Sequence, residues 1–167
     1  MIEVELKAIV NDVQKIKKIL ESFAEVERPY QKKDIYFKKD DFIVRLREDI
    51  ENIVTFKKKV IEDGVEVSEE NEFVVGDPTV FIKFLHLSGF KEYYHKNKNG
   101  CSYKYDELTF DLSLVNNLGW YLEIEKLVGK KDDIENAKKQ IMKMLKRVGL
   151  ENNIESRTYE QLILNTK

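Results

Sequence analysis

Charged and apolar residues alternate from the second residue of the chain onward. The apolar positions are Ile2, Val4, Leu6 and Ala8, and the charged positions between them are Glu3, Glu5 and Lys7. Because successive side chains of a β-strand point to opposite faces, residues 2–9 are predicted to form a strand with one apolar and one charged face. Similar patterns predict strands at 26–37, 42–50, 52–61, 65–75 and 119–128, and two more on either side of Asn99-Gly100.

Between the strands, apolar residues spaced three and four apart predict helices. The first begins after Asn11 or Asp12, the second runs from Asp77-Pro78 to Gly89, the third begins at Asp132 or Asp133, and a short last helix begins near Ser156. Asp63-Gly64 and Asn99-Gly100 are typical hairpin dipeptides. We therefore expect one α+β domain over residues 1–167, in which about eight mostly antiparallel strands close into a barrel with flanking helices.

The charged faces of these strands differ in sign. Basic side chains two residues apart are Arg45 and Arg47, Lys57 and Lys59, and Lys96 and Lys98; acidic ones are Glu66, Glu70 and Glu72, then Asp111, and then Glu123 and Glu125. A single strand of this kind usually gives its charged face to water. Repetition over five or six strands, segregated by sign, favours instead a closed sheet with an ionic interior.

An interior of this kind needs a ligand, because clustered like charges are costly without a counter-charge. Arginine and lysine side chains match the oxygens of phosphate groups. Paired carboxylates hold hard divalent cations, which share ligands with phosphates. The residues therefore indicate a binding site for a polyphosphate together with a divalent cation.

Composition and net charge bear on three further properties: nucleic-acid binding, disulfide bonds and membrane association. Charged residues make up 36% of the 167 residues, but the net charge is only -2, so bulk charge does not indicate nucleic-acid binding. One cysteine, Cys101, excludes an intramolecular disulfide. No apolar run approaches the roughly 20 residues of a membrane span, so we expect no membrane association and a cytoplasmic location.

The charged motifs also occur in an order that resembles the CYTH superfamily, the triphosphate tunnel metalloenzymes. The matching segments are Glu3-x-Glu5-x-Lys7, Asp34-Ile35-Tyr36-Phe37, Arg45-Leu46-Arg47, Thr55-Phe56-Lys57, Glu70-Asn71-Glu72, Asp111, Leu118-Gly119, Glu123-Ile124-Glu125 and Thr158-Tyr159-Glu160-Gln161-Leu162. The resemblance covers essentially the whole chain. One departure is Lys98, which stands where the family has the arginine of its K-x-R pair.

The resemblance implies a role for each charged residue. Triphosphate binding falls to Lys7, Arg45, Arg47, Lys57, Lys59, Lys96 and Lys98. One or two Mg²⁺ or Mn²⁺ ions would be held by Glu3, Glu5, Glu123 and Glu125. Catalysis would rest on Glu3, Glu5 and Lys7, and the tunnel wall would include Glu70, Glu72 and Asp111.

Length and motifs most resemble the class IV adenylyl cyclase branch, which implies conversion of ATP to cyclic AMP and pyrophosphate. A metal-dependent hydrolase of tripolyphosphate, a nucleoside triphosphate or thiamine triphosphate is the alternative, because the same walls serve both reactions. A non-catalytic sensor of polyphosphate or nucleotide is the third reading. The implied partner is a nucleoside triphosphate or an inorganic polyphosphate, and the resemblance is also compatible with a homodimer.

Overall fold

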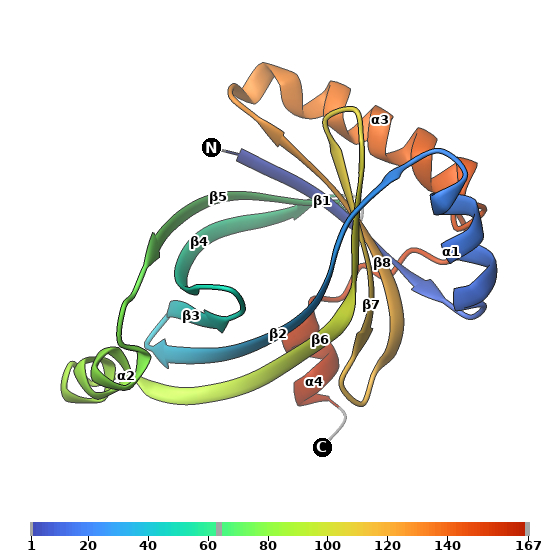
Figure 1. The fold of residues 1–167 in the computed structure, drawn as a ribbon. Coiled ribbons are helices and arrows are strands. Elements are labelled where there is room, and N and C mark those ends of the chain that lie inside the picture. The colour runs from blue at the N-terminus through green and yellow to red at the C-terminus, as the bar shows by residue number, and fades with distance from the viewer. Residues whose placement is uncertain (1, 63–64, 166–167) are drawn as a thin grey trace.

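The eight strands form a closed antiparallel barrel, in the order β1-β5-β4-β3-β2-β6-β7-β8 (Figure 1). The computed structural model describes residues 2–62 and 65–165, with the side chains of residues 57–60 and 62 outside the description. The strands are β1 (Ile2–Val10), β2 (Glu25–Lys39), β3 (Phe42–Glu48), β4 (Asn52–Glu62), β5 (Val65–Val74), β6 (Lys91–Tyr105), β7 (Leu108–Val115) and β8 (Gly119–Val128). The predicted α+β barrel is confirmed.

Within the described residues, four α-helices flank the barrel: α1 (Val13–Glu21), α2 (Pro78–Leu87), α3 (Ile134–Arg147) and α4 (Tyr159–Leu164). Side-chain caps fix where three of them begin, because a cap satisfies backbone N–H groups of the first turn. Asp12 accepts from the N–H of Lys15 ahead of α1, and Asp77 accepts from that of Val80 ahead of α2. Thr158 forms a capping box with Gln161, so the last helix begins slightly later than Ser156. None of the described helices is long and apolar enough to span a bilayer.

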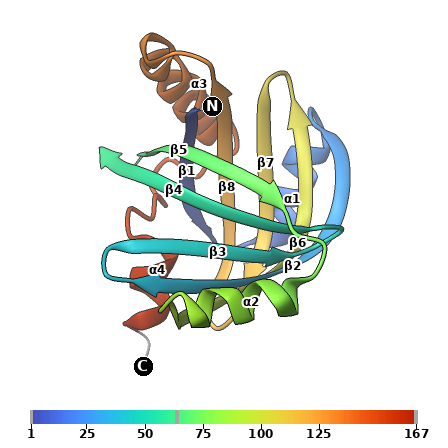
Figure 2. The ribbon, with the colours of Figure 1, turned by 90° about the vertical axis from the view of Figure 1, so that its left-hand side faces the viewer.

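The apolar faces of the strands point outward to the helices. The main core lies between α1, α3 and the outer faces of β1, β6, β7 and β8, with Leu6, Phe110 and Leu145 among its fully buried side chains. A smaller core packs α2 against β2, β3 and β4 around Phe37 and Leu46, along one edge of the barrel (Figure 2). Since side chains alternate along each strand, this arrangement turns the charged faces into the barrel.

The predicted hairpin at Asn99-Gly100 is wrong. Strand β6 continues through both residues, and Gly100 pairs with Ser113 of β7. A Cβ atom at Gly100 would collide with the backbone oxygen of Leu112, so this glycine permits close approach of two strands. The chain reverses after residue 105, where Asp106 adopts a left-handed conformation (φ 51°) that aspartate tolerates in turns. The other predicted hairpin, Asp63-Gly64, lies outside the described residues.

Candidate active site

The barrel encloses a cavity of about 660 Å³ whose walls are mostly charged. Twelve of the residues singled out from the sequence line it: Glu3, Glu5, Lys7, Arg45, Arg47, Glu70, Glu72, Lys96, Lys98, Asp111, Glu123 and Glu125. These twelve residues come from six of the eight described strands: β1, β3, β5, β6, β7 and β8. The side chains of Lys57 and Lys59 lie outside the described part of the structure. Closing the sheet thus brings together charged faces that are far apart in sequence.

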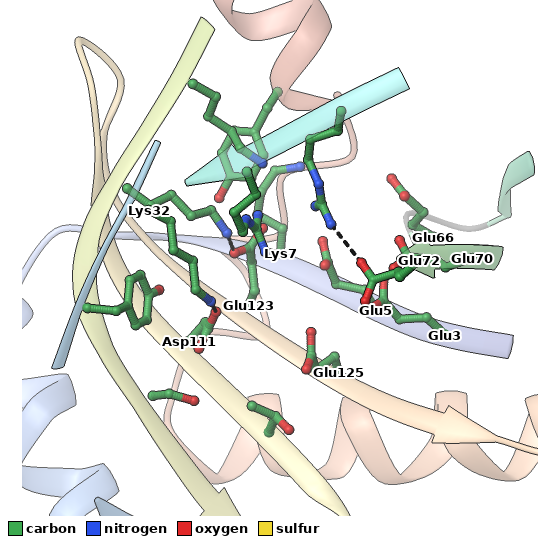
Figure 3. Close-up of a pocket in the computed structure, with 18 of the residues that line it drawn as sticks. Glu3, Glu5, Lys7, Lys32, Glu66, Glu70, Glu72, Asp111, Glu123 and Glu125 are labelled. Atoms are coloured by element: carbon green, nitrogen blue, oxygen red, sulfur yellow. Dashed lines mark hydrogen bonds and ion pairs between the residues drawn. The ribbon is translucent and has the colours of Figure 1, made fainter. Parts of the chain in front are cut away.

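Carboxylates from three adjacent strands form an acidic wall. Strand register places Glu5 of β1 directly opposite Glu66 of β5 on one side and Glu125 of β8 on the other. Glu3 lies one step further along β1, and Figure 3 shows these side chains gathered on one side of the cavity, together with Glu70. Directly opposed residues of paired strands have Cβ atoms about 5 Å apart, so like charges here repel.

The same repulsion acts on Glu125. Burial and the neighbouring Asp111 and Glu5 carboxylates raise the pKa of Glu125 to about 7. A divalent cation would relieve the same repulsion, and oxygen donors are the ligands that Mg²⁺ and Mn²⁺ prefer. Among the described residues, no three Asp, Glu, His or Cys side chains are already drawn together into a metal cluster. The donor chemistry of the acidic wall nevertheless fits such an ion.

A buried ion-pair cluster lies on the basic side of the barrel. Asp34 of β2 is only 1% exposed and accepts hydrogen bonds from Arg47, at 2.8 Å from Nε and 2.9 Å from a terminal guanidinium nitrogen. The ammonium of Lys96 lies 3.3 Å from the same carboxylate. Although burial raises the pKa of Asp34, Lys96 and Arg47 together hold it well below its usual value. Asp34 therefore stays ionised and fixes two cations at the cavity wall.

Arg45 is positioned by the two neighbouring strands. A terminal nitrogen of its guanidinium donates to the hydroxyl of Thr55 (2.6 Å) and to the carboxylate of Glu72 (3.1 Å). The Thr55 hydroxyl in turn donates to Glu72 at 2.6 Å. This bridge across β3, β4 and β5 orients the guanidinium while its Nε remains buried without a partner among the described residues.

Two further lysines lie deep in the cavity. Lys98 forms an ion pair with Glu123, yet burial and the nearby Lys96 ammonium lower the pKa of Lys98 to about 7. Lys7, whose pKa burial also lowers, donates to the backbone oxygen of Arg157 at 2.7 Å. Because burial removes water from these ammonium groups, an anion bound beside them would strongly stabilise their charged form.

Sequence reasoning did not assign several of the cavity residues to the site. Lys32 pairs with Asp111 at 3.2 Å (Figure 3), while Tyr30 and Tyr36 line the wall on the same strand. Tyr36 stacks on Tyr94 with ring centroids 4.1 Å apart. The sequence does contain a pattern that could have identified them, because every second residue from Tyr30 to Tyr36 lies on one face of β2.

Comparison with known proteins agrees with this geometry. The CYTH domain family matches residues 1–159. A Methanocaldococcus jannaschii protein, named as a candidate adenylate cyclase, is 28% identical over 97% of this chain and 98% of its own length. The solved structure of the Pyrococcus horikoshii protein PH1819 superposes with a TM-score of 0.88, at 28% identity and 99% coverage of both chains. A Hippeastrum protein, described as a candidate adenylyl cyclase with a dominant triphosphatase activity, shares the fold at a TM-score of 0.68 and 15% identity, over 99% of this chain and 96% of its own.

Proposed function

This chain belongs to the CYTH domain family, and we propose that it binds a nucleoside triphosphate inside its barrel and converts ATP to cyclic AMP and pyrophosphate. The single observation that carries the proposal is that basic and acidic side chains lie on opposite walls of the cavity. Cations from β1, β2, β3 and β6 face an acidic wall built by β5, β1 and β8. A triphosphate bound with a divalent cation supplies the counter-charge that both walls need.

The cationic side chains would bind the phosphate chain. Arg45 and Arg47 are held in place by their own carboxylate partners, so they present oriented donors without further ordering. Lys7, Lys96 and Lys98 would add point charges deeper in the cavity. Positioning and electrostatic stabilisation dominate phosphoryl transfer, and this arrangement offers both.

The acidic wall would hold the divalent cation. Glu5 and Glu125 face each other across the strand pair, and Glu3 and Glu123 lie one step away on the same two strands. Because Glu123 is paired with Lys98, we assign the principal contacts to Glu5 and Glu125, with Glu3. A bound Mg²⁺ or Mn²⁺ ion would neutralise phosphate oxygens and activate the attacking oxygen.

Hydrolysis of a triphosphate is the second candidate. Nearly every strand contributes charged side chains to the cavity wall, and these suit the phosphate chain of a substrate. The wall therefore specifies the organic group of the substrate less closely than its phosphates. The description of the Hippeastrum protein as a triphosphatase supports this alternative on the level of the shared fold. In cyclisation the ribose 3′-hydroxyl attacks the α-phosphorus and pyrophosphate leaves. In hydrolysis water attacks the terminal phosphorus, the remaining diphosphate (ADP from ATP, or pyrophosphate from tripolyphosphate) leaves, and the attacked phosphorus is released as orthophosphate.

A product assay separates the candidates. Purified protein is incubated with ATP and with tripolyphosphate, each with Mg²⁺ and with Mn²⁺, and the products are resolved by chromatography. Cyclic AMP with pyrophosphate supports the cyclase, and orthophosphate supports the hydrolase. Binding without turnover would indicate that the protein is a non-catalytic sensor of polyphosphate or nucleotide.

Two variants test the site itself. Glu125→Gln should abolish metal-dependent turnover while the fold is kept, and Arg47→Ala should weaken triphosphate binding at low salt. Lys139→Ala on the exposed side of α3 is the matched control, expected to behave as the unaltered protein. Undiminished turnover in the glutamine variant would contradict the assignment of the metal site.

A further inference from the structure

The C-terminal segment returns to the barrel after α3 and is anchored there at several points. The N–H of Ile9 donates to the oxygen of Asn153 at 2.9 Å, and the N–H of Glu155 donates to the oxygen of Lys7 at 2.9 Å. The hydroxyl of Tyr93 on β6 donates to Glu160 of α4 at 2.8 Å. These contacts fix α4 beside β6 (Figure 1), so its side chains have defined positions relative to the cavity.

One of those side chains, Tyr159, lines the cavity and is only 8% exposed. Its ring packs edge-on against Tyr121, with centroids 5.5 Å apart. The ammonium groups of Lys7, Lys96 and Lys98 lie 4.7, 4.9 and 5.2 Å from the centroid of the ring. A tyrosine face attracts cations, so this single ring gathers three ammonium groups that otherwise repel one another.

The hydroxyl of Tyr159 is buried and has no hydrogen-bond partner among the described residues. Burial, followed by the Glu5 carboxylate, raises the pKa of Tyr159 well above its usual value, so the group keeps its proton. A buried donor without an acceptor is unfavourable, and native structures rarely leave one unless a ligand or water supplies the acceptor. The ammonium groups of the three neighbouring lysines are positively charged, so they would attract an anionic acceptor to this hydroxyl.

We propose that Tyr159 is a phosphate-binding residue supplied by the C-terminal helix, whose hydroxyl donates a hydrogen bond to a phosphate oxygen of the substrate. Its ring holds the ammonium groups of Lys7, Lys96 and Lys98 around the same phosphate group. The inference rests on the proposed triphosphate site and adds to it a neutral donor from outside the barrel strands. It also gives α4 a function, because the helix completes the site.

The test compares Tyr159→Phe, which keeps the ring but removes the hydroxyl, with Tyr159→Leu, which removes both. Binding of tripolyphosphate is measured by calorimetry with fixed Mg²⁺ at low salt. Hydrogen bonds to charged groups are strong enough that the phenylalanine variant should bind about tenfold more weakly, and the leucine variant more weakly still. Tyr105→Phe is the matched control, since that ring packs against Phe23 in the outer core.

A second readout separates binding from a structural contribution. Because the hydroxyl of Tyr159 has no hydrogen-bond partner in the described part of the chain, removing it should leave the melting temperature of the unliganded protein unchanged or raised. The rise in melting temperature produced by tripolyphosphate should become smaller in the phenylalanine variant.

Three results would overturn the proposal. Equal affinity of the unaltered protein and Tyr159→Phe would show that the hydroxyl does not bind phosphate. A lower melting temperature of unliganded Tyr159→Phe would show that the hydroxyl has a structural partner instead. Failure of the unaltered protein to bind tripolyphosphate or ATP at all would refute the proposed function itself, and this inference with it.

Discussion

Replacing Asp34 by asparagine should destabilise the protein strongly at neutral pH. The substitution keeps the size of the side chain but removes the negative charge that Arg47 and Lys96 share. All three groups are buried or nearly so, with side-chain exposures of 1%, 16% and 6%. Removing one partner of a buried ion pair typically costs about 3–5 kcal/mol, because the remaining charge is left uncompensated. Since a domain has only about 5–15 kcal/mol of stability in total, the loss should be large.

The free energy of unfolding is measured by urea denaturation of both proteins at pH 7. Asp49→Asn is the matched control. The side chains of Asp49 and its partner Arg28 are 12% and 36% exposed, more than those of Asp34 and Lys96, and this pair should contribute about 1 kcal/mol or less. The pKa of Asp34 is depressed in the folded protein, so its contribution is present above its unfolded value near 4 and is lost as the pH falls further.

The difference between the two Asp34 proteins should therefore shrink in acid. Saturating tripolyphosphate should also recover part of the loss at pH 7, since the added anion restores the missing counter-charge. A destabilisation by Asp34→Asn below about 1 kcal/mol, or no greater than that of the control, would refute this account of the buried cluster.

Further predictions concern Glu125, Gly100 and the ligand. Since the pKa of Glu125 is raised to about 7, ionising it opposes folding, and stability should fall between about pH 4.5 and 7. Glu125→Gln should remove that decline and gain on the order of 2 kcal/mol over the unaltered protein at pH 8, by urea denaturation; an unchanged pH profile would contradict it. Gly100→Ala should cost about 1–3 kcal/mol in thermal or urea unfolding, because its Cβ would collide with Leu112, whereas Gly76→Ala meets no atom within 4 Å and should be nearly neutral. Tripolyphosphate with Mg²⁺ at a hundred times its Kd should add about 2.7 kcal/mol to the unfolding free energy, and no shift in melting temperature would argue against an ionic binding site.

Secondary structure was readable from the sequence wherever a local rule decided it. Period-two alternation located the strands, and Asp12, Asp77 and Thr158 cap their helices through contacts within a few residues. The hairpin predicted at Asn99-Gly100 was wrong because a glycine at this position is compatible both with a tight turn and with the close approach of two paired strands. Only the backbone of Leu112, a distant residue brought alongside by β7, decides between them.

The candidate site could be predicted as a set of residues but not as a set of interactions. Alternation identified Glu5, Glu123 and Glu125 as members of charged faces, and the order of motifs indicated one shared interior. It could not show that Glu123 pairs with Lys98 while Glu125 faces Glu5, since that depends on strand register. Register is set by the pairing of whole strands across the closed sheet.

The sequence by itself determined which side chains face inward, because the direction of each side chain follows from its own strand. The tertiary structure decided which of them meet and how strongly each is desolvated. Asp34 is the clearest example: its motif was visible in the sequence, but its burial between Arg47 and Lys96 arises only when β2, β3 and β6 pair. Tyr159 likewise lies in a short C-terminal helix, and only barrel closure places three lysines around its ring. Charge and hydrogen-bonding energies depend on distance and solvent exposure, and both of these are properties of the folded chain.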